Sequence, residues 1–167
     1  MTKRKHKAQR GTPLPRVQLR RPVEADLGTL FDYHLERESI WMAAFPPRDR
    51  EAFIAHWRGV LADAGVVKKT ILCDGRVAGY IVSFNRSGER QVGYWLGKAF
   101  WGKGVATQAL AQFLTYERAR PLVAHVVTHN VASVRVLEKC GFAFWRRDRA
   151  AAATGGEVVE EVVLKLD

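Results

Sequence analysis

Seven consecutive residues have the types and spacing best suited to chemistry: the segment 101–107, with the sequence WGKGVAT. Its glycines, Gly102 and Gly104, allow a sharp turn and a close approach of the backbone to a ligand. The segment follows the apolar run 92–96 and precedes a run with helical spacing, so it joins an expected strand to an expected helix. The first amides of such a helix have no intrahelical acceptor and favour an anion, above all a diphosphate. The sequence therefore predicts a phosphorylated cofactor at this turn.

Two better-known phosphate loops do not fit this segment. The chain has no Gly-x-x-x-x-Gly-Lys-Ser/Thr run, which disfavours a nucleoside triphosphatase. The third glycine of the dinucleotide fingerprint and its later acidic residue are also missing. A different cofactor is implied, although a Gly-x-Gly turn can also be a plain connection between a strand and a helix.

A second segment, 130–142 (NVASVRVLEKCGF), follows the apolar run 122–127. Asn130 is a good N-cap for a helix, and Gly141 is a natural stop at its end. Taken in order with Gly93-Tyr-Trp-Leu and the 101–107 turn, this segment closely resembles the GNAT superfamily of acyl-CoA-dependent N-acetyltransferases. The pattern is most similar to the branch that acetylates the N-terminal alanine or serine of ribosomal proteins. The resemblance runs from about Val17 to Leu166.

This resemblance implies acetyl-CoA (coenzyme A) as the cofactor, bound where two neighbouring parallel strands, roughly 91–97 and 122–128, splay apart. Backbone groups of the first strand would pair with the pantetheine arm as with an added strand, and one amide would polarise the thioester carbonyl. The helix start would hold the diphosphate, with Lys103 either adding charge or remaining a solvated surface lysine. The residues that the resemblance assigns to the cofactor are Tyr94, Trp95, Leu96, Gly102, Lys103, Gly104, Val105, Ala106, Thr107, Asn130 and Ser133.

The resemblance also assigns catalytic roles. Asn130 matches an asparagine that contacts the pantetheine arm, a role compatible with helix capping. Ser133 matches a serine proposed to donate a proton to the leaving thiolate, and the alternative is that it satisfies first-turn amides. The chain departs from the wider superfamily at Leu137, where many members have a tyrosine acid, and at Gln91, where relatives often have a glutamate base. A thiolate with a pKa of about 8.5 is a tolerable leaving group, so turnover does not require that tyrosine.

The missing glutamate bears on the acceptor. The remaining candidates for a base are Glu89, the first choice, with Glu38, His125 and His129, and each can instead be a solvated charge or a structural imidazole. At pH 7 a lysine amine needs about 4–5 kcal/mol to lose its proton, whereas an α-amine needs about 1 kcal/mol. The sequence thus predicts acetyl transfer to a peptide or protein N-terminal α-amine by direct attack in a ternary complex. A small-molecule amine, a non-catalytic CoA-binding sensor and a nucleic-acid-binding module remain alternatives.

The expected fold is mixed α/β: a single-domain GNAT-type sandwich of residues 17–167 with a central, mostly antiparallel sheet splayed at a parallel strand pair. Between the first two helices, the segment 40–47 is too apolar for a solvent loop. It either lines the acceptor pocket or seals the core edge with Trp41 and Phe45. The expected elements are a strand at 17–20, helices around 27–35 and 53–61, a hairpin at 70–84 turning at 74–75, a polar turn at 85–90, a strand at 92–96, a helix from 106, a strand at 122–127, a helix at 131–140, a mobile turn at 150–156 and a closing strand at 157–166.

Charge separates the N-terminal arm from the rest of the chain. The formal net charge is +10, and residues 1–16 hold six Lys/Arg and no acid, which predicts a disordered basic tail. This tail either contacts ribosomal or other nucleic acid or is solvated without a partner. No run approaches the roughly twenty apolar residues that cross a bilayer, and no secretion signal is evident. Cys73 and Cys140 are typical of buried thiols, not of a disulfide or metal pair. We expect a cytoplasmic protein without metal or membrane partners, and a homodimer is left open.

Overall fold

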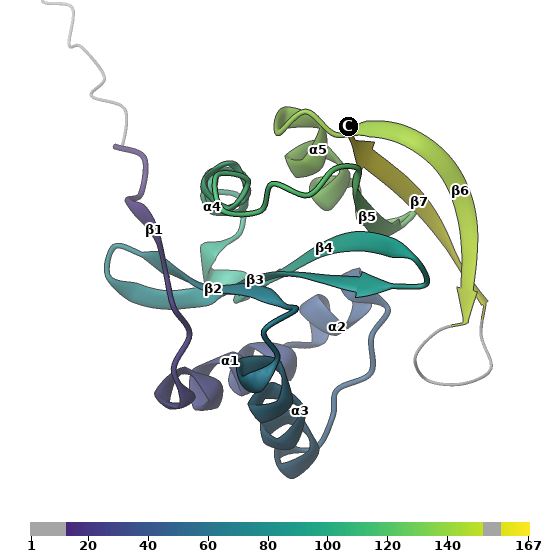
Figure 1. The fold of residues 1–167 in the computed structure, drawn as a ribbon. Helices are drawn as coiled ribbons and strands as arrows, with labels where there is room; N and C mark the ends of the chain where they lie inside the picture. The colour runs from purple at the N-terminus through teal and green to yellow at the C-terminus, as the bar shows by residue number, and fades with distance from the viewer. Residues whose placement is uncertain (1–12, 152–157) are drawn as a thin grey trace, which may run out of the picture.

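The computed structural model describes residues 13–151 and 158–167, which form one seven-stranded sheet with helices on both faces (Figure 1). The strand order is β1-β2-β3-β4-β5-β7-β6, and every neighbouring pair is antiparallel except β4 and β5. This confirms the expected fold class. The strands are β1 (Val17–Arg20), β2 (Val67–Cys73), β3 (Arg76–Arg86), β4 (Glu89–Leu96), β5 (Leu122–Val127), β6 (Ala143–Ala151) and β7 (Val158–Leu166). The helices are α1 (Leu27–His34), α2 (Arg37–Ala43), α3 (Arg50–Ala62), α4 (Val105–Phe113) and α5 (Val131–Lys139), with short 3-10 turns at Glu24–Asp26 and Lys98–Phe100.

The two helical layers bury opposite faces of the sheet (Figure 1). Helices α4 and α5 cover one face and share the larger core, to which β4 contributes Val92 and Leu96. Helices α1 and α3 cover the other face, where Leu30 and Phe53 belong to a second core. Because side chains alternate along a strand, Trp95 lies on this second face. Its ring stacks on the ring of His34 of α1, with 3.9 Å between the ring centroids. One face of β4 therefore supports the α4–α5 layer, and the other meets α1.

The parallel pair β4–β5 separates early. Its register contains only Arg90↔Leu122 and Gln91↔Val123, although β4 continues to Leu96 and β5 to Val127. Beyond those pairs, the facing backbone edges of the two strands lack the ladder that neighbouring strands normally supply. The expected splay is thus confirmed, and it begins at Gln91 and Val123.

Several local expectations need correction. The turn expected at 85–90 is only Ser87-Gly88, because both residues have a positive φ, as a two-residue hairpin turn requires, and the ladder extends to Arg86↔Glu89. The segment 40–47 is not a loop at its start: residues up to Ala43 belong to α2, which ends at the left-handed Ala44. Trp41 does not seal the core, since it is 62% exposed. Leu35 lies beyond α1 and is exposed.

Other expectations fall partly outside the described residues. Most of the basic tail, residues 1–12, and most of the turn at 150–156 lie there, although Ala150 already belongs to β6. Cys73 is a buried free thiol, as predicted, whereas Cys140 is a free thiol that is only partly buried. Among the described residues, no helix has the length and apolar character needed to span a membrane.

Candidate active site

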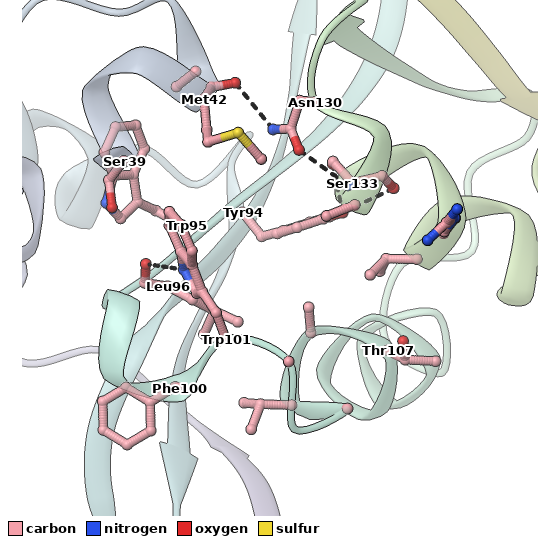
Figure 2. Close-up of a pocket in the computed structure, with 18 of the residues that line it drawn as sticks. Ser39, Met42, Tyr94, Trp95, Leu96, Phe100, Trp101, Thr107, Asn130 and Ser133 are labelled. Carbon is pink, nitrogen blue, oxygen red and sulfur yellow. Dashed lines mark hydrogen bonds between the residues drawn. The ribbon is translucent and has the colours of Figure 1, made fainter. Parts of the chain in front are cut away.

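A cavity of about 420 Å³ opens between the end of β4, the start of α4 and one side of α5 (Figure 2). Helix α2 closes its remaining side, through Ser39, Met42 and Ala43. Ten of the eleven residues predicted to bind the cofactor line this one cavity: Tyr94, Trp95, Leu96, Gly102, Gly104, Val105, Ala106, Thr107, Asn130 and Ser133. Residues from two distant segments of the sequence therefore meet around one space.

The start of α4 lines this cavity at the position where the sequence predicts an anion site. Gly102 and Gly104 have φ values of 69° and 74°. Residues other than glycine adopt this left-handed backbone conformation only with strain. The amide of Gln108 bonds back to the Gly104 carbonyl at 3.1 Å and closes the first helical turn. The amides of Val105, Ala106 and Thr107 precede that bond and have no helical acceptor. They meet the cavity with the positive end of the helix dipole.

The cationic side chains that line the cavity do not include Lys103, the one that the sequence predicted. Lys103 is absent from the lining described above, and its ammonium group donates to the Ala99 carbonyl at 2.7 Å. Arg135 and Lys139 line the cavity from α5 instead. Sequence reasoning missed both, although their spacing of four residues places them on one face of that helix. Each supplies a positive charge to a cavity that also contains unpaired amides.

Asn130 and Ser133 connect α5 to its neighbours (Figure 2). The Asn130 side chain accepts from the Ser133 amide at 3.1 Å, which confirms the predicted N-cap, and donates to the Met42 carbonyl of α2 at 3.0 Å. The Ser133 hydroxyl lies 2.7 Å from the Tyr94 hydroxyl. Burial raises the pKa of Tyr94 to about 12, so this phenol keeps its proton at neutral pH. Ser133 is thus in a side-chain hydrogen bond within the cavity wall.

A second cavity of about 140 Å³ adjoins the first, with which it shares Met42, Ala43, Tyr94, Asn130 and Ser133. It lies in the splay, where Gly93 of β4 and Ala124 of β5 face it. Leu137 also lines this cavity, so the residue that replaces the superfamily tyrosine presents a side chain that cannot donate a proton. His125 and Glu161 line the same cavity. The splay therefore connects the Ser133 hydroxyl with an imidazole and a carboxylate.

His125 is held between two carboxylates. Its Nδ1 lies 3.0 Å from Glu161 Oε2, and its Nε2 lies 3.2 Å from Glu89 Oε2. The hydrogen bond with Glu161, and then that with Glu89, raises the pKa of His125. Partial burial opposes ionisation of Glu89, but hydrogen bonds from His125 and Arg146 outweigh it, and the pKa of Glu89 is lowered. Sequence reasoning named Glu89 and His125 separately and missed both Glu161 and Arg146.

The other two candidates for a base have different partners. Glu38 pairs with Lys98 at 2.5 Å on the surface, and it is more than half exposed. His129 Nε2 lies 2.7 Å from the Trp41 carbonyl, and its ring contacts the Trp41 ring. Neither side chain lines the two cavities. No group of three His, Cys, Asp or Glu residues in the described parts of the chain is arranged to hold a metal ion.

Comparison with known proteins identifies the family. Residues 16–143 match the model of the acetyltransferase (GNAT) domain. A relative described as "Putative ribosomal N-acetyltransferase YdaF", from Bacillus subtilis (strain 168), is 36% identical over 101 residues, which are 56% of this chain and 55% of that protein. The matched region thus spans about half the length of this relative.

Solved structures of low sequence identity share the fold. RimL, a ribosomal L7/L12 α-N-protein acetyltransferase in complex with coenzyme A, superimposes with a TM-score of 0.72 at 18% identity, covering 90% of this chain and 93% of that one. A spermidine N-acetyltransferase from Vibrio cholerae, in complex with CoA and spermine, gives a TM-score of 0.77 at 15% identity, covering 90% and 94%.

The domain match, the splayed sheet and the glycine turn at the start of α4 lead to one conclusion: this chain belongs to the GNAT acetyltransferase family. This family is the one that the sequence motifs predict. The family does not fix the amine that receives the acetyl group.

Proposed function

We propose that this acetyltransferase acetylates the N-terminal α-amine of a peptide or protein by direct attack in a ternary complex. The observation that carries the proposal is the acid–base equipment beside the smaller cavity. Gln91, which cannot act as a base, stands where relatives often have a glutamate, and the nearby carboxylate of Glu89 is already bound to Arg146 at 2.9 Å. An α-amine with an ordinary pKa of about 7.8 needs only a moderate base, whereas a lysine amine near 10.4 needs a stronger one.

The residues of the larger cavity fit acetyl-CoA. The unpaired amides at the start of α4, with Arg135 and Lys139, suit the phosphates, because charge-assisted hydrogen bonds contribute about 1.5–3 kcal/mol each. The backbone edge of β4 from Val92 to Leu96 has no β5 ladder and suits a pantetheine arm bound as an extra strand. When bound, acetyl-CoA supplies the thioester carbonyl that the amine attacks.

Ser133 is the proposed donor of a proton to the departing sulfur. Its hydroxyl lies in the wall shared by both cavities, 2.7 Å from the Tyr94 phenol. The protonated phenol can donate to the Ser133 oxygen, which leaves the serine proton free to point at the sulfur and polarises that bond. Glu89, which lies 3.2 Å from His125 Nε2, is the proposed carboxylate that assists deprotonation of the amine.

The proposal is tested with two matched peptides. One has a free N-terminus and no lysine, and the other has a blocked N-terminus and a single lysine. We expect kcat/KM to favour the free N-terminus at least about a hundredfold, since the two amines differ by about 3–4 kcal/mol in the energy of deprotonation at pH 7. Faster transfer to lysine would contradict the proposal. Binding of acetyl-CoA without thiol release for any amine would instead indicate a CoA-binding sensor.

A polyamine acceptor is the second candidate. Two carboxylates, Glu89 and Glu161, lie near the smaller cavity and suit a cationic amine. A spermidine N-acetyltransferase also shares this fold. Spermidine included in the same assay decides between the two, because a kcat/KM above that of the free N-terminus would favour the polyamine.

A further inference from the structure

We propose that His125 takes the proton from the acceptor amine, with Glu89 and Glu161 as positioning residues that hold its ring. This inference rests on the proposed function and names the proton acceptor of the same site. The base expected from the sequence, Glu89, then acts through His125 and not on the amine itself.

The contacts of His125 accommodate two protonation states without movement of a side chain. In the neutral ring, Nδ1–H donates to Glu161 at 3.0 Å, and Nε2 accepts from the Gln91 amide at 3.3 Å. In the charged ring, Nε2–H donates to Glu89 at 3.2 Å. Gln91 also lies 3.2 Å from Glu89, as a donor in either state. Because a glutamate at this position would place a third carboxylate beside the imidazole, Gln91 is the residue that permits the neutral ring.

The charges around the ring come from three strands. Glu89 of β4 and Glu161 of β7 face it directly, and Arg146 of β6 reaches Glu89 at 2.9 Å and Asp148 at 3.5 Å. Arg146 offsets one carboxylate charge, and the other remains to stabilise a charged imidazole. The side chains of His125, Glu89 and Glu161 are 21%, 22% and 17% exposed, so a proton taken up by the ring can leave to solvent.

The smaller cavity is lined by both of the groups proposed to handle protons. Ser133 lines it from α5, and His125 lines it from β5. An ammonium acceptor must lose two protons overall. One goes to His125, directly or through one water, and then to solvent. As the new N–C bond forms and the C–S bond breaks, the nitrogen loses its second proton and Ser133 gives its own proton to the departing sulfur. The proton released by the nitrogen, carried through water, restores the Ser133 hydroxyl.

Other histidines of the described chain lack this arrangement. His34 is buried between aromatic rings, where burial lowers its pKa to about 4, so it stays neutral. His129 contacts a backbone carbonyl of α2. His56 of α3 is exposed and lines neither cavity, which makes it a matched control for substitution.

The test compares His125→Gln with His56→Gln. We expect His125→Gln to lower kcat/KM for the preferred amine about a hundredfold at pH 7, with little change in the KM for acetyl-CoA, because a positioned base contributes about 10²–10⁴-fold. The deficit should shrink as the pH is raised above the pKa of the acceptor. His56→Gln should leave the rate unchanged, and thermal unfolding of both variants checks that they are folded.

A second measurement does not depend on activity. NMR titration of the His125 ring without acetyl-CoA should give a midpoint above 6.5, and Glu161→Gln should lower that midpoint and shift the pH–rate profile in the same direction. An unchanged rate and profile in His125→Gln would overturn the proposal, as would a Glu161→Gln profile that does not follow the ring. Absence of transfer by the unsubstituted enzyme to any amine would instead remove the proposed function.

Discussion

Two charged clusters start from neighbouring residues of β4 and lie on opposite faces of the sheet. Arg90 binds Glu117 at 2.7 Å, and Ser83 donates to the same carboxylate. Glu89 binds His125 on the other face. In the first cluster one cation meets one anion, and Arg90 and Glu117 are 15% and 4% exposed.

The second cluster also pairs a basic side chain with carboxylates, but the carboxylates outnumber the imidazole. Two carboxylates share one imidazole, and a cavity reaches that imidazole. The Arg90–Glu117 pair lines neither of the two cavities described above. An ion pair that is balanced in charge and closed to solvent is structural, whereas an excess of carboxylate charge beside a cavity lets an imidazole gain and lose a proton.

The largest expected effect is a loss of stability when the Arg90–Glu117 cluster is broken. Arg90→Met leaves the Glu117 carboxylate buried without its cation, and loss of one partner of a buried pair costs about 3–5 kcal/mol. We expect urea denaturation to show a fall of that size in the free energy of unfolding. The rate per folded molecule should not change. A double variant with Glu117→Gln should recover much of the loss, and a fall below about 1 kcal/mol would show that solvent reaches this pair.

A smaller effect sharpens the contrast between an imidazole with carboxylate partners and one without. Burial, with a further contribution from Arg48, lowers the pKa of His34 to about 4 from its ordinary 6.5. The unfolded chain therefore binds more protons below 6.5, and the stability present above that pH falls as pH drops toward 4. Between pH 7 and pH 5 the loss should be about 2 kcal/mol. His34→Gln should remove this part of the pH dependence, and an unchanged slope would contradict the assignment.

The smallest expected effect concerns the cluster of Glu89, His125 and Glu161. Glu89→Gln keeps the shape of the side chain but removes the charge that stabilises the protonated imidazole. We expect kcat to fall about tenfold, equivalent to about 1.4 kcal/mol, with a lower titration midpoint for His125. The free energy of unfolding should change by less than about 1 kcal/mol, because these side chains are partly exposed. A large loss of stability without a change in the titration would make Glu89 a structural residue like Glu117.

The sequence predicts most of the residues that line the larger cavity because its signals are local. Two glycines and a run of helical spacing specify the start of α4, and Asn130 specifies that of α5. The short helix α2 is missed because its segment has no strong helical period of its own. Its contact with the distant Asn130 is made by the Met42 carbonyl and cannot be read from the local sequence.

The cluster of Glu89, His125 and Glu161 could not be predicted from local signals. Glu89, His125 and Glu161 come from β4, β5 and β7, and only the non-sequential order of these strands brings them together. The sequence shows Gln91 where relatives often have a glutamate base. Its role as a hydrogen-bond donor to His125, however, depends on the register of the parallel pair β4–β5. Register across separate strands has no signature within any one of them.

The early separation of β4 and β5 also has a mechanical consequence. Two residue pairs form the whole parallel ladder between the half-sheet β1–β4 and the half-sheet β5–β7–β6. Beyond those two pairs, side-chain packing and not main-chain bonding holds the two half-sheets together. A donor substrate bound in the gap would bridge the two half-sheets where they share the fewest main-chain hydrogen bonds. At a concentration of 100 Kd, it would add about 2.7 kcal/mol to the free energy of unfolding.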